Sequence, residues 1–576
     1  MSSGILIVGG GRVADALYDG LRRSGYQARR APGQGVSPRL LARTRLLVWP
    51  VTEDAGAGPR EGLSRLLAIR PPAAPLRVLL VGAQARPAAL PELPAGSGAT
   101  LETLDLARAF ARDLLARRPV HGAMDPPFGQ VPHLLFAGEA PPAAALAEQA
   151  MRLAHYGGTR PVFTFAGEHP QRLCDSLEEA YPQVRRLCRL RCTRIDAPGL
   201  DGEPPVTAVY VCVEPPAAGL QTARGLMRLI ELRQGVSPPI HLEVGDAEPG
   251  GELAEWDGQL FPFSWFREAC QPRVWLDGHR DELAQVVHEH YRDSIAAQGR
   301  DPAGEQAGLP WGELAESYRD ANRHQADHLW AKLAVTDCRA VPEEQVESFA
   351  FAPLEVERLA VVEHARWAAD RYLQGWSFAP RRDNARKHHP QLVPYADLSE
   401  PMKDLDRFAV RLVPLLLARS GRGLVRMLIV GVPDGAQGAS ADPALGRVAD
   451  LALQRLARRY PDRSLVLAST LARPSSRLIV RLAAARFAAG LFLLCERPIA
   501  ETLDAQPGPA ERGDLLDLLA RAERRVCLGP AQTAADWFAR RAEILLLCER
   551  PSPSARPAKR VVLDAAAGAP DWSFEY

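Results

Sequence analysis

The densest group of side chains suited to chemistry lies in residues 375–395, with the sequence GWSFAPRRDNARKHHPQLVPY. Guanidinium groups bind phosphates through paired hydrogen bonds, and a lysine ammonium adds a point charge. The chain carries a formal net charge of only +1, so this charge is local. It favours a pocket for a phosphate-bearing small molecule over a nucleic-acid track, with these phosphate-facing candidates: Arg381, Arg382, Arg386 and Lys387.

A second group stands near the N-terminus, where Gly9-x-Gly11-x-x-Ala14 follows the apolar run 5–8 and opens a helical pattern. This is the context of a dinucleotide-binding turn, in which the backbone at Gly11 approaches a pyrophosphate. An NAD site places an acid at the end of the next strand, but Arg29 and Arg30 stand there. Either arginine meets a phosphate, or the region is a Rossmann-like fold without a ligand.

Catalytic signatures are missing from the sequence. It has no GxSxG, no GxxxxGK[ST] and no HExxH. Glu363 next to His364 is a possible acid–base couple, but such neighbours are common on helices. His388 and His389 have no third ligand at a suitable spacing, so no metal is expected. These observations favour a binding protein over an enzyme and predict no catalytic residue.

The elements that must position these groups fall into four regions. Strand-like apolar runs alternate with helix-length segments in three of them, which predicts parallel, doubly wound sheets. In the remaining region, from 281 to about 417, strand signals vanish and helical periodicity takes over. We therefore predict an α/β multidomain protein in which Rossmann-like sheets flank an all-α module, with SGRG (420–423) as one linker and these domains: 1–125, 126–250, 275–420 and 424–576.

The helical region contains an internal repeat. PWGELAESYRDANRHQAD, from Pro310, aligns at a constant offset with PYADLSEPMKDLDRFAVR, from Pro394. Upstream, His288-x-x-Tyr291 corresponds to His364-x-x-Trp367. Tandem copies of one helical unit bury faces that neither copy buries alone. Only the second copy carries the basic loop.

The second copy strongly resembles the ryanodine-receptor repeat, through H-A-R-W (364–367), G-W (375–376), P-x-R-D-N-x-x-K-x-H-P (380–390), L-V-P-Y (392–395) and D-R (406–407). In the animal channels, a tandem pair of these repeats takes up an adenine nucleotide. The resemblance implies that Tyr291 and Trp367 stack on the base and that His364 and Asp383 belong to the same nucleotide site as the basic loop. Trp376 is expected to be core packing.

The first two α/β regions resemble the nucleotide-binding domains that regulate potassium uptake and conductance in bacteria. The better match is the second, with HLLFAG, PVFTFAG, AVYVCVE and PPIHLEV. Its turn 138–142 (GEAPP) departs from the family's glycine pattern. The last region resembles the SLOG superfamily of nucleotide-related sensors through LVLASTLARPSSRLIVRLAAARFAAGLFLLCERP, although Pro474, Ser476 and the stretch 550–552 replace the family's ligand-binding positions.

Composition narrows the setting. No run approaches eighteen uncharged apolar residues, so no membrane span is expected, and nine cysteines without a CxxC favour free buried thiols in the cytoplasm. We therefore expect a homo-oligomeric sensor that binds an adenine nucleotide, an ADP-ribose-like molecule or NAD(P). The resemblance implies that it signals to a separate polypeptide, a membrane channel or an anti-phage effector. Two alternatives stay open: an NAD(P)-dependent enzyme using the Gly9 turn, and a structural scaffold with vestigial Rossmann units.

Overall fold

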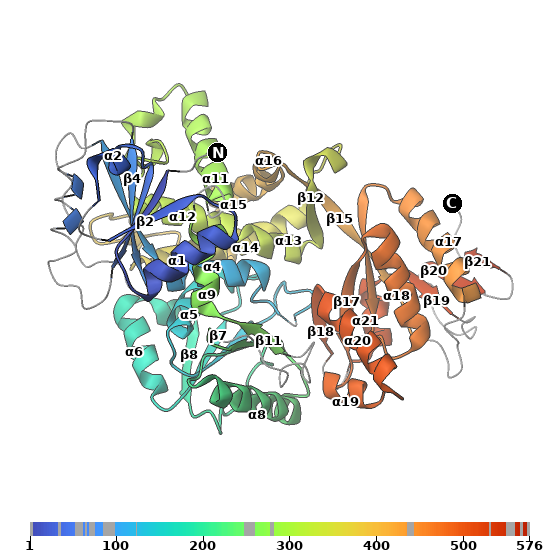
Figure 1. Ribbon diagram of the computed structural model, residues 1–576. Coiled ribbons are helices and arrows are strands. Elements are labelled where there is room, and N and C mark those ends of the chain that lie inside the picture. Colours follow the sequence, from blue (N-terminus) through green and yellow to red (C-terminus); the bar gives the residue numbers. More distant parts are fainter. Residues whose placement is uncertain are drawn as a thin grey trace.

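A computed structural model describes residues 4–32, 36–51, 62–63, 66–67, 75–83, 98–122, 124–246, 260–276, 281–434, 443–528, 532–548, 559–564 and 568–572. Three largely parallel sheets and a set of helices make up the molecule (Figure 1). The first sheet (blue) lies above the second (cyan to green), and the third (orange to red) lies at the right. The predicted α/β multidomain fold class is confirmed, whereas the four domain boundaries stay predictions.

The first sheet has the strand order β2-β1-β3-β4-β5, and every neighbouring pair is parallel. Its inner strands are nearly continuous apolar runs because helices cover both faces of such a sheet. β5 is more polar and half-buried along its length. The bounds are β1 Ile5–Val8, α1 Arg12–Arg23, β2 Ala28–Ala31, α2 Pro38–Ala42, β3 Leu46–Val51, β4 Leu76–Gly82, β5 Ala99–Asp105 and α4 Leu106–Arg117.

The second sheet has the order β11-β10-β9-β6-β7-β8, again all parallel. The chain order reverses between β6 and β9, which is the topological switch point of a Rossmann-type sheet. The bounds are β6 His133–Ala137, α5 Pro142–Leu153, β7 Val162–Ala166, α6 Pro170–Ala180, α7 Val184–Leu187, β8 Arg189–Thr193, β9 Ala208–Val211, α8 Pro216–Gln234, β10 Ile240–Glu243 and β11 Leu260–Phe263.

The third sheet has the order β18-β17-β16-β15-β19-β20-β21, with β12 (Cys338–Pro342) paired to β15 off this path; β12 and β21 are antiparallel to their neighbours and the other pairs are parallel. Its first strand begins at Arg422, so SGRG, predicted as a linker, runs directly into a strand. The bounds are β15 Arg422–Gly431, α17 Pro443–Arg459, β16 Arg463–Ser469, α18 Pro474–Phe487, β17 Gly490–Cys495, α19 Ile499–Asp504, α20 Pro509–Arg521, β18 Arg524–Cys527, α21 Ala534–Arg541, β19 Ile544–Leu547, β20 Lys559–Asp564 and β21 Ala569–Trp572.

The predicted all-α module contains one substantial strand, β12, and a short β13–β14 pair. The expectation of helices alone was wrong because β12 is stabilised by pairing antiparallel with β15, a partner distant in sequence. The bounds are α9 Trp265–Ala269, α10 Pro272–Trp275, α11 Glu282–Ala297, α12 Glu316–Asp327, α13 Leu329–Val335, β12 Cys338–Pro342, α14 Pro353–Leu373, β13 Ser377–Phe378, β14 His388–His389, α15 Glu400–Arg411 and α16 Val413–Ala418.

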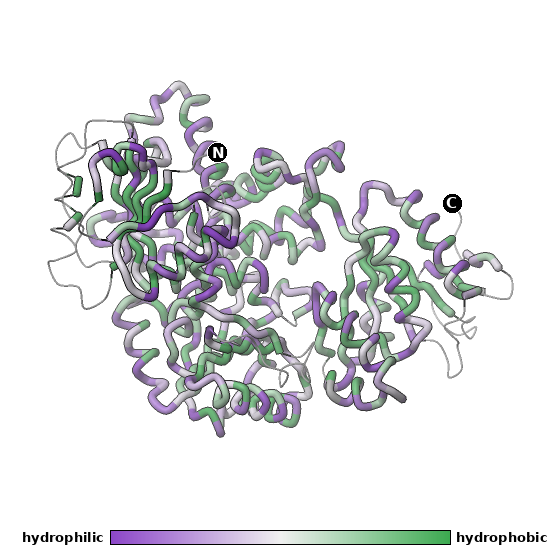
Figure 2. Tube along the Cα trace, viewed as in Figure 1, coloured by the Kyte–Doolittle hydropathy of each residue, from purple (hydrophilic) through white to green (hydrophobic). Residues whose placement is uncertain are grey.

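One hydrophobic core joins the first two sheets and reaches the helical module. It includes Leu17 on α1, Phe110 on α4, Met151 on α5 and Leu359 on α14, all essentially buried. The third sheet has separate cores on its two faces. Figure 2 shows the strands of the sheets as mainly hydrophobic and the outer helices as mixed, as expected for sheets covered on both faces.

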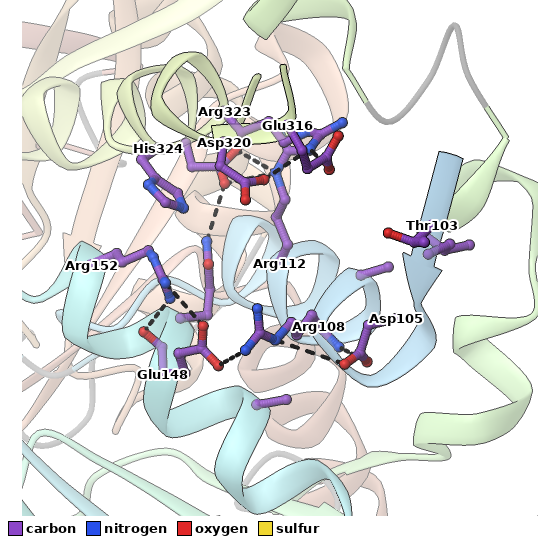
Figure 3. Close-up of a pocket in the computed structure, with 15 residues that line it drawn as sticks. Thr103, Asp105, Arg108, Arg112, Glu148, Arg152, Glu316, Asp320, Arg323 and His324 are labelled. Atoms are coloured by element: carbon purple, nitrogen blue, oxygen red, sulfur yellow. Dashed lines mark hydrogen bonds and ion pairs between the residues drawn. The ribbon is translucent and has the colours of Figure 1, made fainter. Parts of the chain in front are cut away.

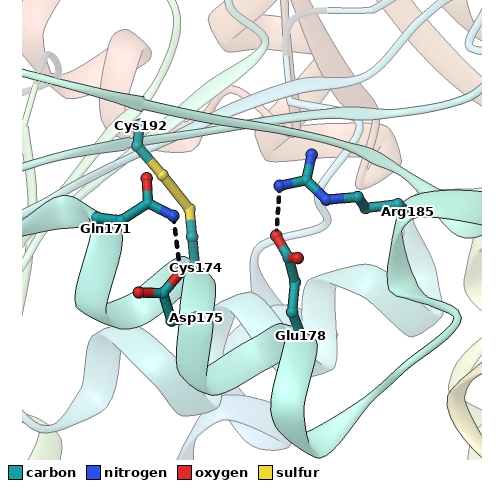
Figure 4. Close-up of a disulfide and its surroundings, with 6 residues drawn as sticks. All are labelled: Gln171, Cys174, Asp175, Glu178, Arg185 and Cys192. Carbon is teal, nitrogen blue, oxygen red and sulfur yellow. Dashed lines mark hydrogen bonds and ion pairs between the residues drawn. A yellow bond between two sulfur atoms is a disulfide. The ribbon is translucent and has the colours of Figure 1, made fainter.

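Two cysteines correct the expectation of free thiols. Cys174 on α6 is disulfide-bonded to Cys192 on β8 (Figure 4). The sequence placed Cys188 nearer to Cys192, but the packing of α6 against β8 selects Cys174. Six other cysteines have free thiols: Cys188, Cys212, Cys270, Cys338, Cys495 and Cys527. Among the described residues, no helix combines the length and the apolar character needed to cross a bilayer.

Candidate functional site

The sequence repeat corresponds to a repeated structure. α11 and α12 form the first copy, and α14 and α15 form the second. In each copy a histidine on the long helix donates its Nε2 hydrogen to a backbone carbonyl: His288 to Leu309 and His364 to Val393, both at 2.8 Å. The same rings contact the aromatic residue that begins the aligned segment, Trp311 or Tyr395. The two histidines therefore have the same structural role.

An arginine on the second helix of each copy completes the correspondence. Arg323 binds Asp281 with two hydrogen bonds of 2.9 and 2.7 Å, and Arg407 binds Glu357 with two of 2.6 and 3.2 Å. Each arginine also binds two acids on its own helix. Arg323 binds Glu316 and Asp320, and Arg407 binds Glu400 and Asp404. Asp281 and Glu357 each lie seven residues before the histidine of their copy.

The basic loop of the second copy, called the hairpin below, is closed by an antiparallel bridge between Asp383 and His388 and by the parallel β13–β14 pair. Ser377 donates its backbone N–H to the carbonyl of Lys387, and Asp383 and His388 exchange two backbone hydrogen bonds. The Asp383 carboxylate accepts the backbone N–H of Arg386 at 3.0 Å, so Asp383 shapes the loop tip. Lys387 adopts a positive φ of 53° and donates from Nζ to the carbonyl of Gln374. The hairpin therefore holds its charged side chains in a defined loop.

The four cations of this hairpin have few acidic partners. Arg381, Arg382, Arg386 and Lys387 are all exposed. Arg382 donates to the amide oxygen of Asn384. Within the described part of the chain, Arg386 alone of the four has a carboxylate nearby, Asp383 at 3.9 Å. The loop therefore keeps a net positive charge, as the sequence predicted.

His389, at the end of the hairpin, brings the loop against the aromatic residues of α14. Its ring lies edge-on to Trp367, with centroids 4.9 Å apart, and 5.9 Å from the ring of Trp376. Trp367 also stacks on His364, with centroids 5.6 Å apart and an interplanar angle of 26°. Trp367 and Trp376 are half-buried, so both belong to one partly accessible aromatic cluster next to the basic loop.

Arg371 joins this cluster and was missed by the sequence analysis. Its guanidinium lies 5.8 Å from the ring centre of Trp376, and its Nε is buried without a hydrogen-bond partner among the described residues. Burial lowers the pKa of Arg371, and Arg366 and Arg382 lower it further while Asp370 raises it. Arg371 stands one helical turn after Trp367 on α14, a spacing that places both on one helix face and was the available signal.

Positive charges gather at this aromatic cluster. Burial, then Arg382 and Arg371, lowers the pKa of His389. Asp370, the acid adjacent in sequence to Arg371, is already bound to His324 at 2.9 Å and to Arg366 at 2.7 Å. The guanidinium of Arg371 beside Trp376 and the exposed cations of the loop together form a site suited to an anion.

Tyr291, predicted to face Trp367 across a base, lies in a different local setting. It is 41 % exposed, and its hydroxyl donates to the carboxylate of Glu305 at 3.4 Å. The contacts of Trp367 are with His364 and His389 instead. That one base lies between Tyr291 and Trp367 stays a prediction.

Glu363, the acid beside His364, belongs to a buried ion network. It accepts two hydrogen bonds from Arg366 and lies 2.8 Å from Nζ of Lys332. Burial alone raises the pKa of Glu363. The neighbouring cations Arg366 and Lys332 outweigh this effect and hold the pKa well below its ordinary range. Glu363 and His364 thus have separate partners and do not form an acid–base couple.

At the N-terminal glycine turn, Gly9 and Gly11 both have positive φ, as the fingerprint requires, and Ala14 is buried in α1. The side chain of Arg30 covers this turn: it donates to the carbonyl of Gly9 and forms an ion pair with Asp15. Arg29 lines a cavity at the other end of the sheet, next to Gly4 and Tyr26. The structure thus places Arg30, and not Arg29, at the glycine turn.

The two other sheets have carboxylates where a phosphate would lie. After β6, Glu139 accepts the backbone N–H of His169 at 2.7 Å, at the start of α6. After β15, Asp434 accepts from the backbone N–H of Arg473 and from the hydroxyl of Ser476, at the start of α18. An acidic side chain on the N-terminus of a helix occupies the position that favours an anionic ligand. The altered turn at 550–552 lies outside the described residues.

A small cavity of about 90 Å³ lies where β5, α4, α5 and α12 meet (Figure 3). The guanidinium groups that line it already have carboxylate partners: Arg108 and Arg152 with Glu148, and Arg112 with Asp327. The charged side chains that line the cavity therefore compensate one another, and the cavity lies where separate regions of the chain meet. Among the described residues, no group of three or more His, Cys, Asp or Glu side chains is placed to hold a metal ion.

Comparison with protein families gives one match, in the helical module. Residues 353–420 match the model of the RyR domain. This range runs from α14 to the start of the third sheet, so the resemblance expected for the second copy of the repeat is confirmed.

Two solved structures show only weak similarity to this chain. The apo-structure of D-lactate dehydrogenase from Escherichia coli has 8 % identity and a TM-score of 0.17 over 51 % of this chain and 97 % of that chain. The PH0520 protein from Pyrococcus horikoshii OT3 has 12 % identity and a TM-score of 0.19 over 49 % and 92 %. Both TM-scores are too low to support an inference about function.

Proposed function

We propose that the second copy of the repeat binds a nucleotide, and that the protein is a nucleotide sensor. The base stacks on the accessible face of the Trp367–Trp376–His389 cluster, and the phosphates bind Arg371, Arg382 and the exposed cations of the hairpin. The observation that carries this proposal is the guanidinium of Arg371, 5.8 Å from the ring centre of Trp376 and with its Nε unpartnered among the described residues, next to the exposed cations of the basic loop.

The interactions that this site offers are strong enough to bind a small metabolite. A base on an aromatic platform gains about 1–3 kcal/mol, and charge-assisted hydrogen bonds to phosphate are about twice as strong as neutral ones. The Nε of Arg371 is already removed from water without a partner, so a phosphate that binds there does not have to displace an existing ion pair.

We propose that binding is transmitted to a partner through α14. Trp367 and Arg371 face the proposed site, and Arg366 and Asp370, one residue earlier in each case, belong to the adjacent buried ion network. Ligand binding at Arg371 changes the field at this network, which contacts α12 through His324. The recipient of the signal is a separate polypeptide of the channel or effector type.

Isothermal titration with ATP, ADP-ribose and NAD tests the proposal. We expect binding of at least one of them, weakened about tenfold or more by Trp367→Ala. Arg371→Met should remove binding without lowering the melting temperature of the free protein, because it removes an uncompensated cation and keeps an apolar stem.

The matched control is Arg447→Met, which changes an exposed arginine on α17 and should leave binding intact. The proposal fails if none of the three nucleotides gives heat, or if Trp367→Ala and Arg371→Met bind as tightly as the unaltered protein.

A scaffold role for the third sheet is a second candidate, supported by Asp434. Because Asp434 satisfies the N-terminus of α18 internally, that sheet retains the fold but fills the ligand position with its own side chain. Titration of Asp434→Ala with ATP tests this point. If the variant binds ATP at the third sheet and the unaltered protein does not, the Asp434 carboxylate prevents binding there.

A further inference from the structure

A larger cavity, of about 470 Å³, lies between the second and third sheets. Its walls come from two edge strands, β11 of the second sheet and β18 of the third, and from the segment that follows α4. Figure 1 shows β11 and β18 next to each other where these sheets meet. A volume of this size lies within the range of small-molecule sites.

The cavity opens at the amino ends of β10, β11 and β18, because its lining includes Pro239, Leu260 and Arg524, which precede or begin these strands. Ligands of doubly wound sheets bind at the carboxyl ends of the strands. This cavity is therefore distinct from the glycine-turn positions of all three sheets and from the aromatic cluster on α14.

Two guanidinium groups meet at one aromatic ring in the wall. Arg118 lies 4.3 Å and Arg525 4.5 Å from the ring centre of Phe261. Phe261 is the last ring of a ladder across the sheet: the tilted ring of His241 lies 5.5 Å from it, and Tyr210 stacks 4.9 Å from His241. The ladder fixes the ring, and the ring holds both arginines at the cavity.

The other charges of the lining are already compensated. Arg117 binds Asp113 and Glu268, Arg524 binds Asp125, and Glu523 binds Arg339. In contrast, Arg118 has no acidic partner among the described residues, and Arg525 donates only to the carbonyl of Leu519, at 3.3 Å. The net charge left facing the cavity is positive.

A buried guanidinium N–H and a buried imidazole nitrogen without partners point to a ligand at this place. Arg525 is 6 % exposed and its Nε has no hydrogen-bond partner, and His241 is 3 % exposed and its Nδ1 has none, within the described part of the chain. Burial lowers the pKa of Arg525 to about 10, with Cys495 and Cys527 raising it and Arg118 lowering it. Such unpaired buried groups are costly unless something satisfies them.

We propose that this cavity is a second binding site, for a small molecule that carries a phosphate or pyrophosphate group, with Arg118 and Arg525 as its anion-binding residues. The bound anion contacts donors from the segment after α4 and from β18 of the third sheet at once. It therefore stabilises the contact between the second and third sheets, independently of the nucleotide site on α14.

The test uses the full chain carrying Trp367→Ala and Arg382→Ala, so that the proposed site on α14 is disabled. Inorganic phosphate, pyrophosphate and ATP are titrated, and hydrogen–deuterium exchange is measured with the tightest of the three. We expect binding, with protection of the backbone around residues 118–122, 239–242 and 522–527. Arg118→Gln should weaken binding at least tenfold, and Arg525→Lys should weaken it less than Arg525→Gln because it keeps the charge.

Arg233→Gln, which changes an arginine paired with Asp201 at an exposed site, is the control and should bind as tightly as its parent. The proposal is overturned if no probe binds, if protection falls only on 364–389, or if Arg118→Gln binds normally. Exchange on the parent chain decides the matter even where an Arg525 variant fails to fold, and a failure here leaves the nucleotide site on α14 untouched.

Discussion

Arg118, Arg371 and Arg525 share one property: each guanidinium lies beside an aromatic ring and has no acidic hydrogen-bond partner among the described residues. The Arg323, Arg407 and Arg541 guanidiniums, in contrast, are each held by two or more carboxylates. At the scale of residues, arginines that lack an acidic partner among the described residues mark the positions of both proposed sites.

Glu243 gives a residue-scale prediction about pH. It lies buried at the carboxyl end of β10, where it accepts the backbone N–H groups of Trp265 and Gly245. Burial raises its pKa to about 7, against those two hydrogen bonds, which lower it. The folded state therefore keeps a proton on Glu243 up to about pH 7, whereas the unfolded chain releases this proton near pH 4.5. The free energy of unfolding falls as the pH rises from the lower to the higher of these values, and the stabilisation is lost above about pH 7.

We expect Glu243→Gln to remove this loss, because the amide stays neutral at every pH. The difference in stability between variant and unaltered protein should shift in favour of the variant by up to about 3 kcal/mol between pH 5 and pH 8. Melting temperatures measured across that range provide the check. Two parallel curves would show that Glu243 does not titrate in this window.

At the scale of elements, the two copies of the repeat differ in how deeply their arginine–carboxylate clusters are buried. In the first copy, Asp281 also binds Arg112 of α4, and both Asp281 and Arg323 are almost fully buried. In the second copy, the corresponding acids Glu357 and Glu400 are about half or more exposed. The same ion cluster is therefore an interior joint in one copy and a surface feature in the other.

This difference predicts unequal effects of the same substitution. Arg323→Ala leaves acids buried at the joint with α4 and should destabilise the protein by roughly 3 kcal/mol. Arg407→Ala removes an ion pair whose acids are solvated and should have a much smaller effect. Thermal unfolding of the two variants side by side is the measurement. Equal losses would mean that burial of the cluster has no energetic consequence.

Elements with strong local signals were predictable from the sequence, and those stabilised by distant partners were not. The buried strands β6, β7 and β9 are apolar runs, and the 84-residue spacing from Trp311 to Tyr395 marks the repeat. β5 was missed because it is polar, and β12 because β15 stabilises it from a distance. The basic loop of the site was recognisable, but Arg371 and His389 acquire their significance only from the way the hairpin folds onto α14.

At the scale of the whole molecule, one buried carboxylate fastens the third sheet to the rest. The Asp125 side chain is completely buried and accepts from Trp537 at 2.9 Å, from Arg541 at 3.2 Å and from Arg524. Arg541 also binds Asp337 with two hydrogen bonds of 2.8 Å. Three separated segments of the chain thus meet at Asp125, beside the cavity between the sheets.

We expect Asp125→Ala to loosen this junction by roughly 3–5 kcal/mol, because it leaves two arginines and an indole N–H without their acceptor. Hydrogen exchange should rise at 524–541 while the first sheet keeps its protection. Asp201→Ala, at an exposed acid, serves as the matched control and should change neither. Unchanged exchange at 524–541 would show that the junction does not depend on this carboxylate.

The long strand β15 has two sets of neighbours. Residues 422–426 pair with β12 of the helical module, and residues 430–431 pair with β19 of the third sheet. A recombinant fragment that starts at the apparent boundary near 424 would therefore lack a strand that its own sheet is built to receive, and would present an unpaired edge to other molecules. Anyone wishing to isolate the C-terminal part should begin the fragment ahead of Cys338, or supply 338–342 as a peptide in trans.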